Sequence, residues 1–226
     1  MRYLCIIPAR GGSKGIPRKN VKEVAGLPLI AWSINHALSV SQIDRVIVST
    51  DCDEIADVAI RYGAEVPFMR PEVLAKDQSP SDPVLSHAVE YLEVNEGYYA
   101  DAIIMLQPTS PYRKPSALSR AIDCFENTGA DSLVSVQETH GFLWNGGFPA
   151  VALYDYQNRP RRQDIKDTDK LYEENGSIYI IKREAFEQSK NRLGGEITTF
   201  IMDKDESIDI DNEIDLMMIE PLLQAK

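Results

Sequence analysis

Short apolar runs alternate with amphipathic stretches along most of this chain. The runs are rich in β-branched side chains and bounded by turn residues, which predicts buried strands. In the stretches between them, apolar positions recur every three to four residues, which predicts helices with one buried face. Residues 29–38 show this spacing clearly, because Ile30, Ile34 and Leu38 fall on one side of a helix.

The whole pattern predicts an α/β fold. We expect strands over residues 3–8, 45–50, 65–68, 102–106, 131–136, 177–181 and 198–202. We expect helices over residues 29–38, 53–62, 83–93, 116–128 and 213–223. Strands that alternate with helices indicate a Rossmann-like, mostly parallel sheet flanked by helices. Ligands bind such sheets at the carboxyl ends of the strands, so the loops over residues 8–20, 50–53 and 107–113 are the candidate binding loops.

The alternation is interrupted over approximately residues 138–172. This segment holds a Gly-Gly pair, two prolines and a charge-dense stretch at residues 159–170. The α/β pattern then resumes. We therefore expect a single domain over residues 1–226 with a small inserted arm.

Composition narrows the function classes. The chain has 226 residues and a net charge of -11, which argues against a nucleic-acid partner, because such partners need a basic surface. Any anionic ligand must be held by local cations. The apolar runs are too short for a signal peptide or a membrane span. The three cysteines are far apart and without metal-ligand spacing, which favours reduced thiols and a cytoplasmic location.

The loop after the first expected strand carries the strongest chemical signal. Residues 9–20 hold three glycines and four cations. Glycines let backbone N–H groups turn toward an anion, and the cations neutralise it, as a triphosphate requires. The order Ser13-Lys14 excludes a Walker A loop, and the loop has no GxGxxG pattern.

This loop resembles the signature loop of the acylneuraminate (CMP-sialic acid) cytidylyltransferases. Three further segments resemble the same family in the same order: residues 106–111 (LQPTSP), 174–179 (ENGSIY) and 207–211 (SIDID). The resemblance implies a nucleotidyltransferase-type fold with a dimerisation arm. It also implies transfer of CMP from CTP to the anomeric hydroxyl of a sialic-acid-like, nine-carbon nonulosonate, with release of pyrophosphate.

The resemblance also assigns nucleotide-binding residues. Those in the first loop are Arg10, Gly11, Ser13, Lys14, Lys19 and Asn20, with the cations on the phosphates and Asn20 on the nucleoside. Arg70, Ser79 and Ser81 are expected to recognise cytosine. Lys19, Arg10 and Asp211 are expected to act in catalysis, with Lys19 stabilising charge at the attacked α-phosphate.

The sugar site is expected to involve Gln107, Asn175 and Tyr179. A carboxamide can donate and accept hydrogen bonds at once, which suits a polyol. The family's arm completes the sugar pocket of a partner chain, so we expect a homodimer in which Arg162 contacts the sugar carboxylate of the other chain.

Four Asp-x-Asp pairs compete as the metal site. They lie at residues 51–53, 167–169, 203–205 and 209–211. Asp209 and Asp211 alternate with apolar residues, which predicts a strand whose polar face points into the site, and the resemblance selects the same pair. We expect them to bind one or two Mg²⁺ ions. Asp215 is expected to be helical and structural, and no general base stands out.

Several alternatives remain. Glu173 and Glu174 stand before Asn175, where the sialate-specific branch has basic residues, so legionaminate, pseudaminate or an eight-carbon 3-deoxy-octulosonate are open as substrates. Outside this family, the chain could be a UTP- or GTP-dependent nucleotidyltransferase. A metal-dependent glycosyltransferase would instead use Asp51 and Asp53. A non-catalytic nucleotide sensor would have no need for Asp209 and Asp211.

Overall fold

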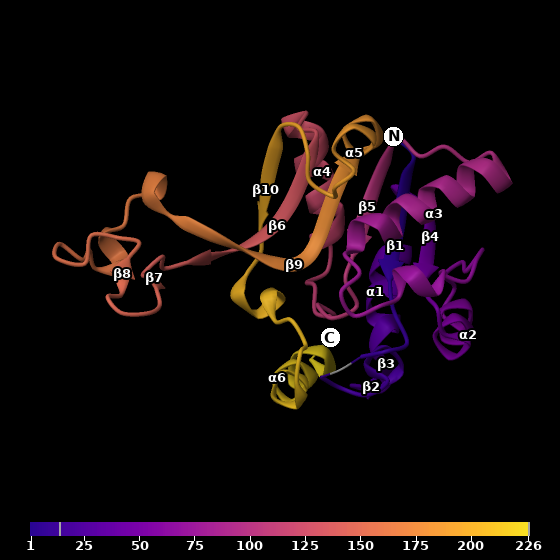
Figure 1. Ribbon diagram of the computed structural model, residues 1–226, viewed down its shortest axis with the longest axis horizontal. Coiled ribbons are helices and arrows are strands. Elements are labelled where there is room, and N and C mark those ends of the chain that lie inside the picture. Colours follow the sequence, from indigo (N-terminus) through magenta and orange to yellow (C-terminus); the bar gives the residue numbers. More distant parts are fainter. Residues whose placement is uncertain (14, 226) are drawn as a thin grey trace.

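The computed structural model describes residues 1–13 and 15–225, and it is built around a six-stranded sheet (Figure 1). The strand order is β10-β6-β9-β5-β1-β4. The strands are β1 (Tyr3–Pro8), β4 (Ile43–Ser49), β5 (Ala102–Leu106), β6 (Ser132–Thr139), β9 (Leu171–Lys182) and β10 (Ile197–Ile201). β1 runs parallel to β4 and β5, and β10 runs parallel to β6, whereas β9 is antiparallel to both of its neighbours. The predicted mostly parallel sheet is confirmed.

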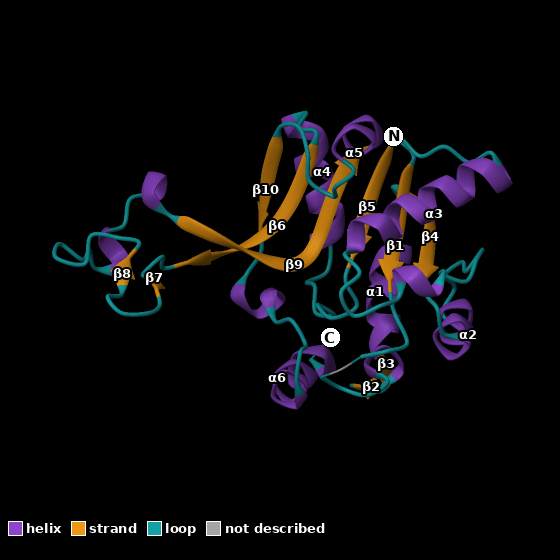
Figure 2. Ribbon diagram, in the orientation of Figure 1, coloured by secondary structure: helices purple, strands orange, loops and turns teal. Residues whose placement is uncertain are grey.

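Helices cover both faces of this sheet (Figure 2). One face carries α1 (Leu29–Leu38), α2 (Asp53–Arg61) and α4 (Ala117–Thr128), and the other carries α3 (Ser81–Glu96) and α5 (Arg183–Ser189). Successive side chains of a strand point to opposite faces. In β1, Cys5 and Ile7 therefore enter the core under α1, while Leu4 and Ile6 enter the core under α3. A strand buried on both faces must be apolar throughout, which explains its unbroken apolar run.

A third, smaller core anchors the last helix, α6 (Glu213–Gln224), beneath the first loop. Leu216, Ile219 and Leu223 of α6 pack against Ile16 and Leu29. Asp215 completes a capping box with Asn212 at the start of α6, so its expected structural role is borne out in the geometry. A two-stranded hairpin, β2 (Glu23–Val24) and β3 (Leu27–Pro28), lies next to this core.

β6 and β9 continue beyond the sheet as a two-stranded ribbon (Figure 1). The ribbon pairs Val136 with Glu174 and Thr139 with Leu171, and it carries the intervening residues away from the body. The segment at its end contains β7 (Trp144–Asn145), β8 (Val151–Ala152), η3 (Arg162–Asp164) and η4 (Asp167–Asp169). A projecting segment thus stands where the sequence predicts an inserted arm. We call residues 140–170 the arm.

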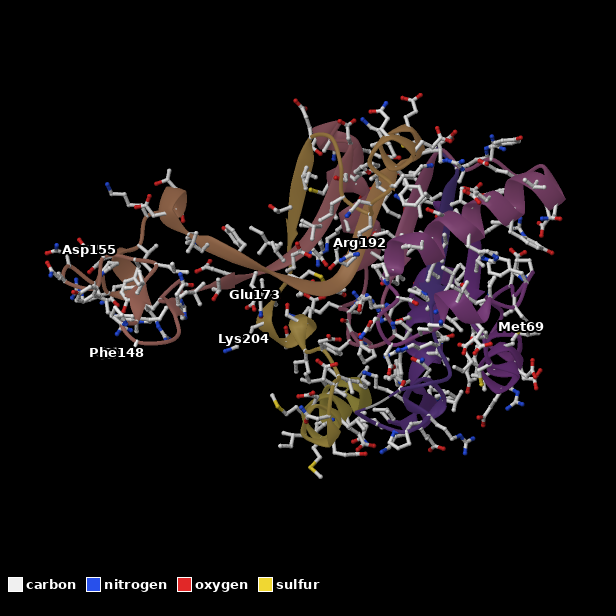
Figure 3. All side chains as sticks on the ribbon, viewed as in Figure 1. Met69, Phe148, Asp155, Glu173, Arg192 and Lys204 are labelled. Carbon is white, nitrogen blue, oxygen red and sulfur yellow. The ribbon has the colours of Figure 1, made fainter. Side chains whose placement is uncertain are left out.

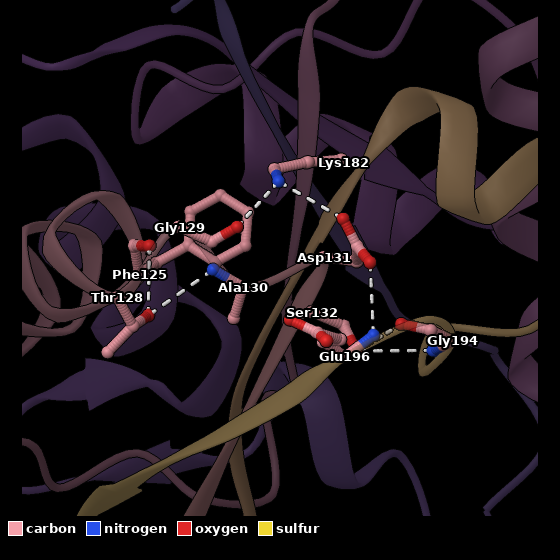
Figure 4. Close-up of polar contacts among 9 residues, drawn as sticks. All are labelled: Phe125, Thr128, Gly129, Ala130, Asp131, Ser132, Lys182, Gly194 and Glu196. Carbon is pink, nitrogen blue, oxygen red and sulfur yellow. Dashed lines mark hydrogen bonds and ion pairs between the residues drawn. The ribbon is translucent and has the colours of Figure 1, made fainter.

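At the opposite end of the sheet, polar contacts join three strands (Figure 4). The Nζ of Lys182 donates to the carbonyl oxygen of Gly129 at 2.7 Å and to Asp131 at 3.1 Å. Asp131 in turn accepts from the backbone N–H of Glu196 at 3.0 Å. These bonds therefore join the start of β6, the end of β9 and the start of β10 at the sheet end opposite the ribbon.

Two expected strands are wrong. Over residues 65–68 the structure has only isolated bridges at Glu65 and Met69, because Pro67 cannot donate to a ladder. Residues 208–211 are likewise not a strand; one bond from Ile210 N–H to the carbonyl of Thr109, at 2.9 Å, fixes them. The alternation holds nonetheless, with Ile210 buried and the flanking aspartates exposed.

Three more short turns of 3₁₀ helix complete the fold. They are η1 (Lys19–Val21), η2 (Glu72–Leu74) and η5 (Lys204–Ser207). Among the described residues, none of the helices has the length and apolar character needed to span a membrane.

Candidate active site

The loops that follow β1 and β5 line a cavity of about 400 Å³ at one edge of the sheet, whereas the expected binding loop after β4 contacts the first loop through Asp51 and, among the described residues, does not line the cavity. Parallel strands present their carboxyl ends together, which brings these loops side by side. The cavity is lined by Pro8, Arg10, Ser13, Gly15, Lys19, Asn20, Arg70, Asp77, Ser79, Pro80, Ser81, Val84, Gln107, Pro108, Thr109 and Asp211. Most of the expected nucleotide-binding residues, together with Gln107 and Asp211, therefore face one space.

Two glycines of the first loop lie in close contact with other segments. The N–H of Gly11 donates to Asp51 Oδ1 at 2.9 Å, and a Cβ at Gly11 would lie 2.9 Å from the Cβ of Cys52. A Cβ at Gly15 would overlap the carbonyl oxygen of Asp211. Only glycine permits these two close approaches. Lys14, an expected phosphate contact, lies outside the described residues.

Acidic groups hold the cations of this loop. Arg10 Nη1 pairs with Asp77 Oδ1 at 2.6 Å. Lys19 Nζ donates to the carbonyl oxygen of Ile210 and lies 3.8 Å from Asp211 Oδ1, with only 13% of its side chain exposed. Sequence reasoning missed Asp77, although it stands two residues before Ser79.

Arg70 is buried in the wall of the cavity. Its Nε donates to Ser49 Oγ at 3.2 Å, and its Nη2 donates to the carbonyl oxygen of Ser49. Burial lowers the pKa of the Arg70 guanidinium to about 10, against the opposing effect of the nearby Asp51 carboxylate. The group still carries its charge at neutral pH. Ser81 begins α3 beside it.

Gln107, Pro108 and Thr109 form the facing wall, and Arg113 supports this wall from behind. The fully buried guanidinium donates to the carbonyl oxygens of Gln107 at 3.2 Å and Ser177 at 2.9 Å. Burial lowers the pKa of Arg113 to about 10. Sequence reasoning missed this residue, because nothing in its local pattern distinguishes it from a surface arginine.

Two expected sugar contacts have other partners in this structure. Asn175 is buried; its Oδ1 accepts from Ser135 Oγ at 2.6 Å, and its Nδ2 donates to Ser207 Oγ at 2.9 Å. The hydroxyl of Tyr179 donates to Glu174 at 3.1 Å, and burial raises the pKa of Tyr179 to about 12. In the described part of the chain neither residue lines the cavity. Their sugar-binding roles stay predictions.

Arg162 lies on the arm. It lines a second hollow of about 510 Å³ together with Phe142, Tyr154 and Leu171. This hollow shares no lining residue with the first cavity. The expected contact of Arg162 with the sugar carboxylate of another chain stays a prediction.

The two aspartates expected to bind metal, Asp209 and Asp211, have different surroundings. Asp211 borders the cavity with 80% of its side chain exposed. Asp209 Oδ1 accepts from Ser110 Oγ at 3.4 Å, and its carboxylate does not line the cavity among the described residues. Asp211 is therefore the better-placed carboxylate of the two.

A second acidic group, Asp203, Asp205 and Glu206, has the spacing of a metal site. Lys114 occupies this group. Its Nζ lies 2.6 Å from Asp203 and 3.2 Å from Asp205, and its backbone N–H donates to Glu206 at 2.7 Å. The hydrogen bond from Lys114 and its charge lower the pKa of Asp203. With a cation already in place, the group fits a structural role.

Two solved structures share the fold of this chain. The structure of CMP:2-keto-3-deoxy-manno-octonic acid synthetase complexed with CTP superposes with a TM-score of 0.71 at 20% identity, over 100% of this chain and 99% of that one. The structure of 4-diphosphocytidyl-2C-methyl-D-erythritol synthase from Anaerococcus prevotii superposes with a TM-score of 0.69 at 11% identity, over 99% and 98%. The fold is thus that of the nucleotidyltransferases.

Sequence relatives give the family. Residues 4–226 match the cytidylyltransferase family, and the chain belongs to it. It is 39% identical to N-acylneuraminate cytidylyltransferase A of Danio rerio over 95% of this chain and 49% of that protein. It is 36% identical to CMP-N,N'-diacetyllegionaminic acid synthase of Legionella pneumophila, over 99% and 97%. It is 33% identical to pseudaminic acid cytidylyltransferase of Campylobacter jejuni, over 96% and 94%. The chain spans about half the length of the Danio rerio protein. The family resemblance inferred from the sequence is confirmed.

Proposed function

We propose that this chain transfers CMP from CTP to the anomeric hydroxyl of a nine-carbon acidic sugar and releases pyrophosphate. The observation that carries the proposal is the convergence of Arg10, Lys19 and Arg70 on one cavity whose facing wall presents Gln107. Cations suit the triphosphate, and the carboxamide suits the sugar hydroxyls. The activities named for the relatives support the proposed reaction.

Lys19 is the proposed stabiliser of the transition state. Its ammonium is largely shielded from water and fixed by the carbonyl oxygen of Ile210. A fixed, desolvated charge acts on developing negative charge without reorganising. The reaction asks little covalent chemistry of the protein, so positioning and charge supply most of the acceleration. Arg10 binds the phosphates once they displace Asp77.

The pyrimidine is proposed to lie against Arg70, Ser79 and Ser81. A guanidinium can donate to the carbonyl oxygen of cytosine, and a hydroxyl can accept from its exocyclic amine. At the position of that amine, uracil carries a carbonyl oxygen. A wall that presents a hydrogen-bond acceptor at this position therefore favours cytosine over uracil. Asn20, whose Nδ2 donates to the carbonyl oxygen of Arg10 at 2.9 Å, is proposed to contact the nucleoside.

The donor set fits Mg²⁺ at Asp211. Mg²⁺ is commonly held by one or two carboxylates and by substrate phosphates, and Asp211 is an exposed carboxylate on the cavity wall. Asp209 would join it by giving up Ser110. When bound, the ion would neutralise phosphate charge and lower the pKa of a coordinated hydroxyl. Asp211 also faces Lys19, so it keeps the ammonium oriented within the cavity.

We propose that the sugar pocket is completed by a second chain. Arg162 belongs to η3 on the projecting arm (Figure 1), and it is not among the residues that line the cavity of its own chain. A homodimer in which each arm reaches the other chain's cavity would bring this guanidinium to the sugar carboxylate, where it can bind in bidentate fashion. A cytoplasmic location stays a prediction.

The sugar is a nonulosonate of the sialate, legionaminate or pseudaminate kind. Relatives named for all three have similar identities, 39%, 36% and 33%, so identity does not select one. Glu174, which accepts a hydrogen bond from the hydroxyl of Tyr179, places a carboxylate next to Asn175 in this chain. An acidic region favours a sugar with amino-derived or hydroxyl donors over one with a second anionic group.

The test is pyrophosphate release with Mg²⁺ across the four nucleoside triphosphates. Each is assayed alone and with N-acetylneuraminate, N,N'-diacetyllegionaminate, pseudaminate and 3-deoxy-octulosonate. We expect release with CTP and one nine-carbon sugar, and release slower by about 10²–10³ from a Lys19→Met variant. Release with UTP or GTP, or with 3-deoxy-octulosonate alone, would contradict the proposed substrates. Release with none of the pairs would contradict the activity itself.

A further inference from the structure

Helix α6 is apolar on two opposite faces. Its inner face, with Leu216, Ile219 and Leu223, is buried in the third core. Ile214, Met217 and Met218 lie on the other side with 68%, 73% and 55% of each residue exposed. With the exposed Pro221 they follow the i, i+3, i+4, i+7 spacing, which forms a stripe about 100° wide along the helix. We call these four residues the outer stripe.

An exposed stripe of this kind needs a partner. Solvated helices normally turn charged or polar residues outward, and a helix that is apolar on all sides is normally buried. The inner face is already fully packed, so rotating α6 would only exchange one exposed face for the other. Methionine is flexible, and it is enriched at protein interfaces.

The arm carries a matching uncovered surface. Trp144 packs edge-on to Tyr154 with ring centroids 5.9 Å apart and lies 5.5 Å from Tyr156. Phe148 is exposed on the same segment (Figure 3). The guanidinium of Arg159 stacks over Phe142 at 4.1 Å. Aromatic residues and arginine are the types enriched at the centres of interfaces.

We propose that the outer stripe of α6 is the docking surface for the arm of a second copy of this chain. The arm extends away from α6 of its own chain (Figure 1), so the contact is between chains. In a two-fold dimer each arm would meet the partner's α6, which gives two equivalent contacts. The inference rests on the proposed dimer and adds the surface that receives the arm.

The charges of α6 and of the arm favour the arm as the segment that covers the outer stripe. Within Glu213–Gln224, α6 has three acidic residues and no basic one. Glu213 and Glu220 flank the outer stripe on one side, and Asp215 flanks it on the other. The arm, residues 140–170, has five basic and four acidic residues, whereas the whole chain carries -11. The arm is therefore slightly basic within an acidic chain, so an acidic helix does not repel it. Complementary charge aligns such a contact and speeds its formation.

The contact would also couple the dimer to the active site. Asp211 and Asn212 lead directly into α6, and Asn212 caps its first turn. An arm that rests on the outer stripe would therefore lie beside the segment that carries Asp211 and contacts Lys19.

The test combines oligomeric state with identification of the neighbour. Light scattering after size exclusion is expected to show a dimer for the unmodified chain. Met217→Asp and, independently, Ile214→Lys should each weaken it about tenfold or more, because each places charge in an apolar contact. Val94→Asp is the matched control, because Val94 is 83% exposed on α3, outside the outer stripe. Circular dichroism checks that each variant is folded.

A photo-crosslinking residue at position 217 then identifies what covers the stripe. We expect mass spectrometry to find crosslinks to peptides from residues 140–170 of a second chain, and none from the same group at position 94. A dimer that both stripe variants leave intact, or crosslinks to another segment, would overturn the docking surface and leave the proposed activity standing. A chain that is monomeric at all concentrations would also overturn it. Pyrophosphate release by that monomer would show that the activity is independent of the dimer.

Discussion

The buried guanidinium of Arg113 donates to the carbonyl oxygen of Gln107 at 3.2 Å. The same Nη2 donates to the carbonyl of Ser177 on β9, and Nη1 donates to Ser33 on α1 at 3.1 Å. One side chain thus ties the sugar-side wall of the cavity to a strand and to a helix. Because the bond to Gln107 goes to its backbone carbonyl, it fixes the position of Gln107 whichever rotamer the carboxamide adopts.

Arg113→Lys should therefore act on the sugar more than on the nucleotide. An ammonium cannot reproduce the planar fork, and carbonyls left without a donor cost about 1–3 kcal/mol each. We expect lower stability in urea and a raised KM for the sugar, with the KM for CTP changed less than about twofold. Arg120→Lys, on the exposed side of α4, is the matched control. Equal increases in both KM values would show that Arg113 only stabilises the fold.

Lys19→Met should lower kcat with little effect on stability. Lys19 makes one backbone contact and a 3.8 Å ion pair, neither of which is central to the core. Loss of one preorganised charge at a transition state typically costs about 10²–10³ in kcat. Lys19→Arg should restore part of the rate. Lys22→Met, which removes a surface ion pair with Glu213, serves as the control. If Lys19→Met retained a near-normal kcat, another group would have to stabilise the α-phosphate.

Asp77→Asn should improve CTP binding. Asp77 holds Arg10 at 2.6 Å and places a negative charge in the cavity that must accept a triphosphate. Partly exposed pairs of this kind are worth about 0.2–1 kcal/mol, so we expect the KM for CTP to fall by roughly two- to fivefold. The effect should shrink at high salt because screening weakens it. Asp57→Asn, on the exposed side of α2, controls for net charge. A raised KM for CTP would mean that Asp77 positions Arg10 for the phosphates.

How much of this site could be predicted from the sequence depends on how far apart in the sequence the contacting residues lie. The strand-end rule placed the loops after β1 and β5 correctly, because apolar runs and glycines are local signals. The pairs Arg10–Asp77 and Gly11–Asp51 join residues 67 and 40 positions apart, and no spacing rule predicts them. Arg70 and Ser81 entered through the family resemblance alone.

The failures in the fold have specific causes. The apolar run at residues 65–68 suggested a strand, but Pro67 interrupts its donors. The alternation at residues 208–211 arises from a single bond to Thr109 and the burial of Ile210. The antiparallel direction of β9 could not be predicted, because it depends on the ribbon that leads into the arm and back. Hydrophobic periodicity indicates which face of a segment is buried, but it does not indicate which strand the segment pairs with.

Tyr179 gives a prediction for alkaline pH. The folded chain keeps the phenolic proton to about pH 12, whereas the unfolded chain loses it near pH 10. Between these values the unfolded state binds fewer protons, so the contribution of Tyr179 to stability falls as pH rises. Tyr179→Phe lacks the hydrogen bond to Glu174 and should be less stable at pH 8. The deficit in free energy of unfolding should shrink by pH 11. A deficit that grows with pH would contradict the raised pKa.

The two acidic groups near the C-terminal segment can be separated by their response to magnesium. Asp211 has an exposed carboxylate on the cavity wall, whereas Asp203 is paired with Lys114 at 2.6 Å. Asp211→Asn should lower kcat and raise the Mg²⁺ concentration needed for half-maximal rate, because Mg²⁺ prefers charged carboxylate ligands. Asp203→Asn should lower stability slightly and leave the Mg²⁺ response unchanged. Chelation should abolish turnover of the unmodified chain, and added Mg²⁺ should restore it. If Asp203→Asn shifted the Mg²⁺ response and Asp211→Asn did not, the metal would belong to the group around Lys114, and that lysine would have to move away when the metal binds.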